Sequence, residues 1–239
     1  MRIIHDRPLI GVLASGAIAL TVLFLCWFYF SKTHPDDKAI SVAENEVYET
    51  VVREMVSPSH GRPAIKELVF ENTVLTDFAH EAGLEPCKEG VREQLRMGIG
   101  TPPFNSLADK IYRGLTRGWD GGPLRADTIE DFAKNSCTEG PLSTAFHTGF
   151  PRAFIDSRSI FFDDTVLTDR TGVRNFRQTF PGASGIIALS HVGFSSNLRE
   201  AIVSTSYVCG SLCGTGRRYI LRKKRGRWEI VDERMVWVP

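Results

Sequence analysis

The chain carries almost no net charge and lacks the common catalytic motifs. Its 29 Lys and Arg residues against 28 Asp and Glu residues give a formal net charge of +1, whereas nucleic-acid binding needs a concentrated basic field. There is no Gly-x-Ser-x-Gly elbow, no Cys-x-x-Cys pair and no EF-hand loop, the signatures of α/β-hydrolases, thioredoxins and calcium sensors. We therefore expect no nucleic-acid partner, no metal and no cofactor, and the sequence assigns no reaction.

What the chain does have is a long apolar run near its N-terminus. Residues 9–30 are 22 consecutive positions without a charge, and a helix of that length spans about 33 Å, against about 30 Å for the hydrocarbon core of a bilayer. Trp27, Tyr29 and Phe30 lie at its C-terminal end, where aromatic rings favour the headgroup region. The run is too long for a cleaved signal peptide and has no small-residue cleavage site. The sequence predicts a tail at 1–8, an uncleaved transmembrane anchor at 9–30 and a linker at 31–38.

Two further features of this run leave alternatives open. Lipid modification at Cys26 would need a small residue before the cysteine, and Leu25 fits that requirement poorly. Gly11, Ser15 and Ala19 recur every four residues and form a small-residue face that could pair two anchors into a weak homodimer. Ordinary small residues in an apolar helix are the simpler interpretation.

The charges that flank the run give only weak evidence for its orientation in the membrane. Arg2 and Arg7 precede it, and Lys32 and Lys38 follow it, which leaves only a slight preference for an N-terminus inside the cell. The cysteines add weight, because an even number after the anchor is compatible with two disulfides in an oxidising compartment. We expect a bacterial inner-membrane protein with a single span and a periplasmic or otherwise extracytoplasmic domain, and disulfides Cys87–Cys137 and Cys209–Cys213. A cytoplasmic domain is the alternative.

Residues 39–239 are expected to form one α+β domain. Apolar residues at helical spacing between Ile40 and Met55 predict an amphipathic helix over 38–56, and residues 68–70 predict a strand. Short connections between later apolar runs favour sequential antiparallel pairing, so we expect a meander sheet packed against this long helix. The four runs are 185–193, 200–208, 217–223 and 227–238.

A helical, loop-rich insertion is predicted at about 80–150, where Gly and Pro are frequent. Short helices are expected at 104–115 and after Asp127, which resembles the first residue of a capping box that ends at Glu130. The segments 68–77 and 160–169 share six of ten residues. Either a duplicated unit or two turns with the same local requirement explains this similarity.

The sharpest constellation is Cys209-x-x-x-Cys213, among glycines. Gly210, Gly214 and Gly216 permit the positive φ of a tight reversal, so a structural disulfide that closes a hairpin is the main interpretation. A reversible redox pair is an alternative. Metal binding is another, and it would need two more ligands, for which His147 and His191 are the candidates.

The same two histidines are the candidates for catalysis, as a hydrolase base assisted by a nearby carboxylate. Ser190 precedes His191, but adjacent residues of a strand point to opposite faces, so the two cannot act together directly. Hydrogen bonding within the sheet and its turns is the alternative role of all these side chains.

Basic residues gather in the last third of the chain, interleaved with apolar ones. Such a hairpin with a charged tip is protected from edge pairing, or it binds phosphate, anionic lipid or an acidic partner. We expect the 209–218 segment, with Arg217 and Arg218, to be the surface that meets an envelope protein partner. The basic residues are Arg217, Arg218, Arg222, Lys223, Lys224, Arg225 and Arg227.

The end of the chain contains a set of motifs in a fixed order: Phe180-Pro181, the run from Ser184 to Phe194, the Cys209–Gly216 loop, Trp228 and Trp237. This order resembles that of a family of uncharacterised bacterial secreted or envelope proteins. The resemblance covers residues 176–239 and implies an envelope location and this C-terminal fold, without a reaction. The chain departs from the family pattern with Phe180 where Tyr is usual, and with His191.

Overall fold

The computed structural model describes residues 35–57, 66–75, 124–136, 138–156, 170–210 and 212–238. The predicted anchor at 9–30, the predicted helix at 104–115, Cys87, Cys137 and the second copy of the internal similarity at 160–169 lie outside these residues. None of the described helices is both long enough and apolar enough to cross a membrane.

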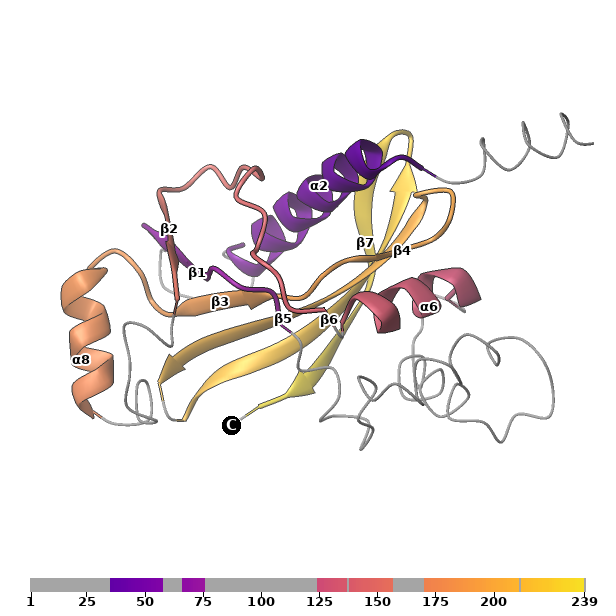
Figure 1. The fold of residues 1–239 in the computed structure, drawn as a ribbon. Helices are drawn as coiled ribbons and strands as arrows, with labels where there is room; N and C mark the ends of the chain where they lie inside the picture. Colours follow the sequence, from indigo (N-terminus) through magenta and orange to yellow (C-terminus); the bar gives the residue numbers. More distant parts are fainter. Residues whose placement is uncertain are drawn as a thin grey trace, which may run out of the picture.

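The described strands form one mixed sheet of seven strands in the order β2-β1-β3-β5-β6-β7, with β4 beside β5 (Figure 1). Strand β3 pairs with β5, β5 with β6 and β6 with β7, and each of these pairs is antiparallel, which confirms the predicted meander. The strands are β1 (Leu68–Glu71), β2 (Arg152–Ile155), β3 (Ile186–Leu189), β4 (Gly193–Phe194), β5 (Glu200–Gly210), β6 (Cys213–Lys224) and β7 (Arg227–Trp237).

The predicted meander would give a wholly antiparallel sheet, but this sheet also contains parallel pairs. Strand β1 lies parallel to both β2 and β3, so the N-terminal strand is placed between segments that come much later in the chain. Leu68, Val69 and Phe70 are all buried, as expected for a parallel strand covered on both faces. The result is a mixed sheet in an α+β fold.

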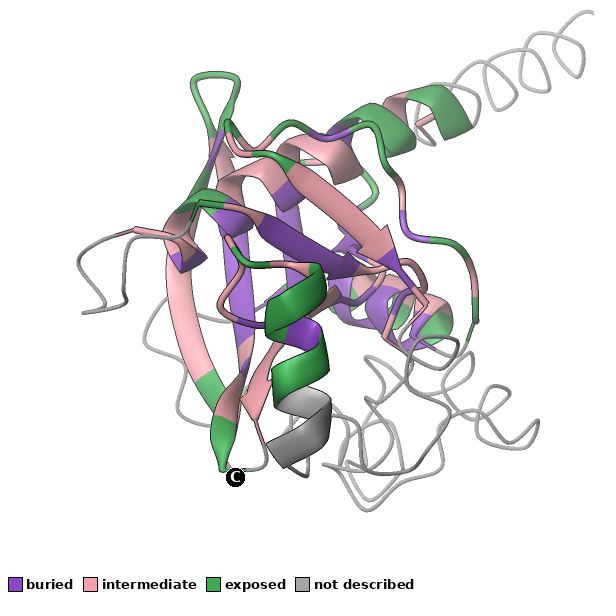
Figure 2. Cartoon of the chain, turned by 90° about the vertical axis from the view of Figure 1, so that its left-hand side faces the viewer, coloured by how far each residue is buried: buried purple, intermediate pink, exposed green. Residues whose placement is uncertain are grey.

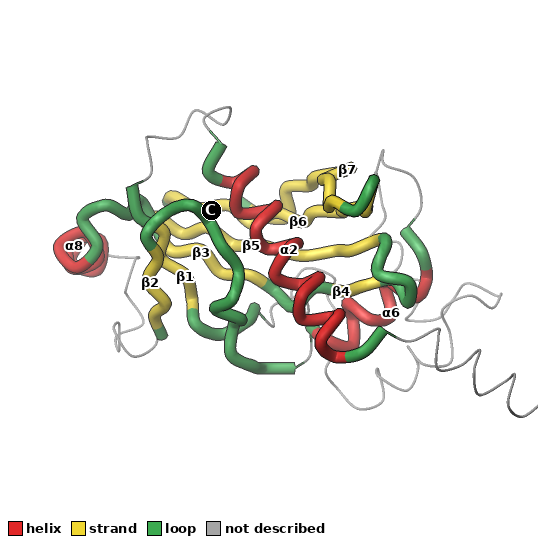
Figure 3. The backbone as a smooth tube through the Cα atoms, turned by 90° about the horizontal axis from the view of Figure 1, so that it is seen from above, coloured by secondary structure: helices red, strands yellow, loops and turns green. Residues whose placement is uncertain are grey.

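Three helices cover the two faces of this sheet. Helix α2 (Asp37–Met55) crosses one face diagonally (Figure 3), and α6 (Ala126–Asn135) and α8 (Arg170–Thr179) lie on the other. Helix α2 confirms the helix predicted over 38–56. Its N-cap is Asp36, whose carboxylate accepts a hydrogen bond from the backbone N–H of Ala39 at 2.7 Å. Alternation along β1 separates the faces, since Phe70 packs in the cluster under α2 and Val69 in the cluster with Phe176 of α8.

The main core lies between α2 and the sheet (Figure 2). Val47, Tyr48 and Val51 of the helix are 0% exposed and face apolar residues of β1, β3, β5 and β6 in one cluster. Phe146, from the segment predicted as an insertion, joins this cluster and makes an edge-on contact with Phe70 at 5.3 Å between ring centroids. Within the described part of that segment, Phe146 therefore belongs to the core.

Helix α6 confirms the predicted helix near Asp127, but not its capping box. The N-cap is Arg125, without a side-chain cap, and Asp127 lies inside the first turn. There its carboxylate accepts hydrogen bonds from Arg125 and from Ser196 of the β4–β5 turn. A long-range contact thus replaces the predicted local cap.

The glycines after Cys209 do not adopt the positive φ that the sequence predicts for them. Strand β5 continues to Gly210 and β6 begins at Cys213, so only two residues connect them. Gly214 and Gly216 lie beneath the indole of Trp237, and a Cβ on Gly216 would sit 2.0 Å from Trp237 Nε1. These glycines make room for an aromatic ring, and positive φ is found instead at Gly226 in the β6–β7 turn.

Candidate functional site

The β5–β6 hairpin ends in the predicted disulfide. The Cα atoms of Cys209 and Cys213 are 5.1 Å apart and their sulfur atoms are within bonding distance. Closing a five-residue loop in this way stabilises the fold by about 2 kcal/mol in the chain-entropy model. The turn inside the disulfide presents Leu212, whose side chain is 90% exposed.

Other exposed apolar side chains lie toward the same end of the sheet. Met235 is 55% exposed and Val238 is 61% exposed, and the register pairs Gly216 of β6 with Trp237 of β7. The C-terminus and the β5–β6 turn lie together at the lower end of the domain in Figure 1. We call Leu212, Met235 and Val238 the distal apolar patch.

The arginines predicted as binding residues are held inside the fold. Arg218 is 4% exposed; its Nε donates to Ser204 Oγ at 3.1 Å, and its guanidinium lies 6.0 Å from the ring centre of Phe132. Arg217 forms an ion pair with Glu233 on the neighbouring strand. Within the predicted 209–218 surface, Leu212 is therefore the large side chain that a partner can reach.

His191 lies between β3 and β4, close to a carboxylate of α2. Its Nδ1 is 3.6 Å from Glu44 Oε1, and the two side chains are 26% and 21% exposed. This separation is longer than the distance of about 3 Å expected for a base and its partner. The hydroxyl of Tyr48 also lies 3.0 Å from Glu44 Oε1 and 2.9 Å from the backbone oxygen of Ser190. Burial, followed by the charge of Glu44, raises the pKa of Tyr48 well above its usual value.

The neighbours of His191 limit what this cluster can do. Ser190 is 3% exposed, and its hydroxyl donates to the backbone oxygen of His191 while it accepts from the N–H of Ser204. It is thus a sheet hydrogen-bonding group and not a nucleophile. His147 is exposed, and its described hydrogen bond is made by its backbone N–H to Glu49. Within the described part of the chain, the two histidines have separate partners and do not form one site.

Sequence reasoning missed Glu44 and Tyr48, although a signal was present. The two residues are four positions apart on a helix that the sequence predicts, so they lie one above the other on the same face. Their contact with His191 was not foreseeable, because residues more than a hundred positions apart meet only through the fold.

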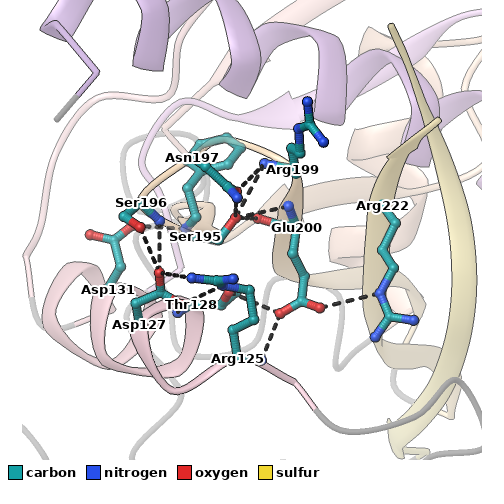
Figure 4. A network of polar contacts seen from close by, with 11 residues as sticks. Arg125, Asp127, Thr128, Asp131, Ser195, Ser196, Asn197, Arg199, Glu200 and Arg222 are labelled. Carbon is teal, nitrogen blue, oxygen red and sulfur yellow. Dashed lines mark hydrogen bonds and ion pairs between the residues drawn. The ribbon is translucent and has the colours of Figure 1, made fainter. Parts of the chain in front are cut away.

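A second polar cluster fastens α6 to the sheet, and Glu200 is at its centre (Figure 4). Glu200 is 5% exposed. Its Oε1 accepts from the Arg125 backbone N–H at 2.8 Å and from Thr128 Oγ1 at 3.0 Å, and its Oε2 accepts from Arg222 Nε at 3.2 Å. With both oxygens engaged by the protein itself, this buried carboxylate is a structural tie.

The pKa values of two aspartates beside Glu200 are shifted in opposite directions. Burial raises the pKa of Asp127, but hydrogen bonds from Arg125 and Ser196 outweigh it and lower that pKa to about 2. Burial dominates at Asp131 and raises its pKa, although Asp131 Oδ2 accepts from the Phe194 N–H at 2.8 Å. Both carboxylates link α6 to the β4–β5 segment, so this attachment depends on pH.

Among the described residues, no group of three or more His, Cys, Asp or Glu side chains could hold a metal ion. Comparison of the chain with protein-family models, with curated proteins and with solved structures finds no match. The resemblance to the envelope family stays an expectation, and function is inferred from geometry.

Proposed function

We propose that this chain is a single-span membrane protein whose extracytoplasmic domain binds an envelope protein partner through the distal apolar patch. The observation that carries the proposal is the 90% exposure of Leu212 on a turn closed by the Cys209–Cys213 disulfide. An exposed large apolar side chain costs nothing to desolvate on binding, and clusters of them mark interaction sites. The apolar run at 9–30 supplies the anchor.

The disulfide supports this role in two ways. It fixes the turn before a partner arrives, which reduces the entropy lost on binding. It also favours an oxidising compartment, where such bonds persist. The surface proposed here is narrower than the one expected from the sequence, because Arg217 and Arg218 are engaged within the sheet.

The partner is tested by cross-linking the full-length chain in its host membrane, followed by mapping of the cross-linked peptides. The wild type is expected to give a product with the partner joined to residues 209–215. Leu212→Gln should abolish it, whereas Val42→Gln, which changes a 52% exposed valine on α2, should not. The same product from Leu212→Gln would exclude this surface.

The compartment is tested by counting free thiols in membranes under denaturing, unreduced conditions. An extracytoplasmic domain should leave Cys209 and Cys213 unreactive until a reductant is added. Rapid labelling of both before reduction would place the domain on the cytoplasmic side.

An envelope hydrolase is the second candidate, and it rests on the position of His191 beside Glu44. Their 3.6 Å separation would have to shorten when substrate binds. In this role Glu44 would orient the imidazole, which would accept a proton from water. The full-length chain is assayed with model esters, amides and phosphodiesters. Loss of turnover in both His191→Gln and Glu44→Gln, with His147→Gln unchanged, supports this candidate. No turnover by the wild type would exclude it for those classes.

A further inference from the structure

The turn between β6 and β7 concentrates positive charge. We call Lys224, Arg225, Gly226 and Arg227 the basic turn; all four are exposed. Arg225 has φ 50° and Gly226 has φ 82°, the positive values of a tight two-residue hairpin turn, and Lys224 pairs with Arg227 across it. Three cations are therefore held at one rigid point.

Acidic neighbours neutralise only part of this charge. Lys224 pairs with Glu229 at 3.2 Å, and the adjacent Lys223 pairs with Glu46 of α2 at 2.9 Å. Arg199 adds another cation next to the turn, because its backbone oxygen accepts from the N–H of Lys223. Its side chain points away from the cluster of Figure 4. Around this turn, and among the described residues, three cations form no ion pair with a carboxylate: Arg199, Arg225 and Arg227.

The basic turn lies at the end of the domain where the anchor is attached. In Figures 1 and 2 the turn and the N-terminal end of α2 are both at the top, and the C-terminus is at the bottom. Six residues, 31–36, separate the apolar run from α2. Even fully extended they reach only about 20 Å. An anchored domain therefore holds this end close to the lipid surface.

We infer that the basic turn docks onto anionic lipid headgroups of the membrane that holds residues 9–30, and so orients the distal apolar patch away from the bilayer. This inference rests on the proposed anchor. Each Lys or Arg near an anionic surface strengthens binding by roughly fivefold, and the short tether adds a high effective concentration. Charge complementarity and position both favour a lipid surface over a diffusing acidic protein.

Docking is tested on the full-length chain reconstituted into vesicles. One set contains phosphatidylcholine alone, and in the other a third of the lipid is phosphatidylglycerol. A membrane-impermeant amine reagent labels exposed lysines, and mass spectrometry gives the rate at Lys224 relative to Lys134, an exposed lysine of α6. We expect this ratio to be at least about fivefold lower on anionic vesicles, and to recover at about 1 M NaCl, where the Debye length is only about 3 Å.

A charge variant keeps Lys224 as the reporter. Arg225→Asn with Arg227→Gln removes two cations and leaves an Asn-Gly turn, which tolerates the same backbone. Docking should weaken by roughly 25-fold and the labelling ratio should match that on neutral vesicles. The control, Arg174→Gln with Arg177→Gln on α8, removes the same charge from exposed positions and should leave protection intact.

The outcomes separate this inference from the proposed anchor. A chain that an alkaline wash strips from both kinds of vesicle has no anchor, and both ideas then fail. A firmly anchored chain with equal Lys224 labelling on the two lipids overturns docking alone. Docking is also overturned if soluble polyglutamate protects Lys224 from labelling and phosphatidylglycerol does not. That result would indicate an acidic protein partner.

Discussion

Different interactions hold the helices on the two faces of the sheet. Under α2 the contacts are mostly apolar and continuous, with Tyr48, Phe70 and Phe146 all 0% exposed. Under α6 the contacts also include a buried carboxylate, Glu200, and two aspartates that bond the β4–β5 segment. The first face derives its stability from burial, which pH hardly changes, whereas the second depends on charges. Mutations on the two faces should therefore differ in size and in pH dependence.

The largest loss is expected from Phe70→Ala on the α2 face. Phe70 stacks on Phe154 at 5.5 Å and meets Phe146 edge-on, so its removal leaves a cavity in an apolar core. The free energy of unfolding should fall by about 3–5 kcal/mol, equally at pH 4 and pH 7. Urea unfolding of the detergent-solubilised chain measures it, and Val42→Ala is the control. A loss below 1 kcal/mol would mean that this core is loosely packed.

Glu200→Ala should be the most damaging change on the α6 face. It leaves Thr128 Oγ1 and the Arg125 N–H without this acceptor, and it removes one partner of Arg222. We expect a loss of about 2–3 kcal/mol, less than for a fully buried pair because Arg222 is 35% exposed. The matched control is Glu229→Ala, an exposed carboxylate in an ion pair, which should cost under about 0.5 kcal/mol. Equal effects would remove the distinction between the faces.

On both faces, the sequence predicts the helices and the C-terminal meander better than the contacts between distant segments, for a physical reason. Helix α2, strand β1 and the C-terminal meander follow from local periodicity and short connections, and Cys209–Cys213 follows from spacing. The four-residue strand β2 and its parallel pairing with β1 depend on partners far apart in the chain. The contacts of Glu200 with α6 and of His191 with Glu44 also join residues far apart in the chain. No short sequence motif could therefore predict them.

Asp127→Asn should reveal the pH dependence of the α6 face. The folded-state pKa of Asp127, about 2, lies below the ordinary value of 3.8. Its stabilisation is therefore complete above about pH 5 and is lost as the pH falls through about 2. The full shift is discounted because a third of the side chain is exposed, which leaves about 1 kcal/mol at pH 7. Wild type and variant should become equally stable near pH 2. A difference that persists there would point to lost packing.

Asp131→Asn should give the smallest effect, and one of opposite sign. Because burial raises the folded-state pKa of Asp131, the ionised form costs stability at neutral pH, and that cost vanishes as the pH falls through the raised pKa to the unfolded one. Asparagine cannot ionise, and its side-chain oxygen can still accept from the Phe194 N–H. The variant should therefore be more stable than the wild type at pH 7, by less than about 1 kcal/mol, and equal to it at acidic pH. Urea unfolding at both pH values measures the gain. A loss at pH 7 would mean that the charged hydrogen bond to Phe194 outweighs burial, and the two aspartates of α6 would then stabilise the fold in the same way.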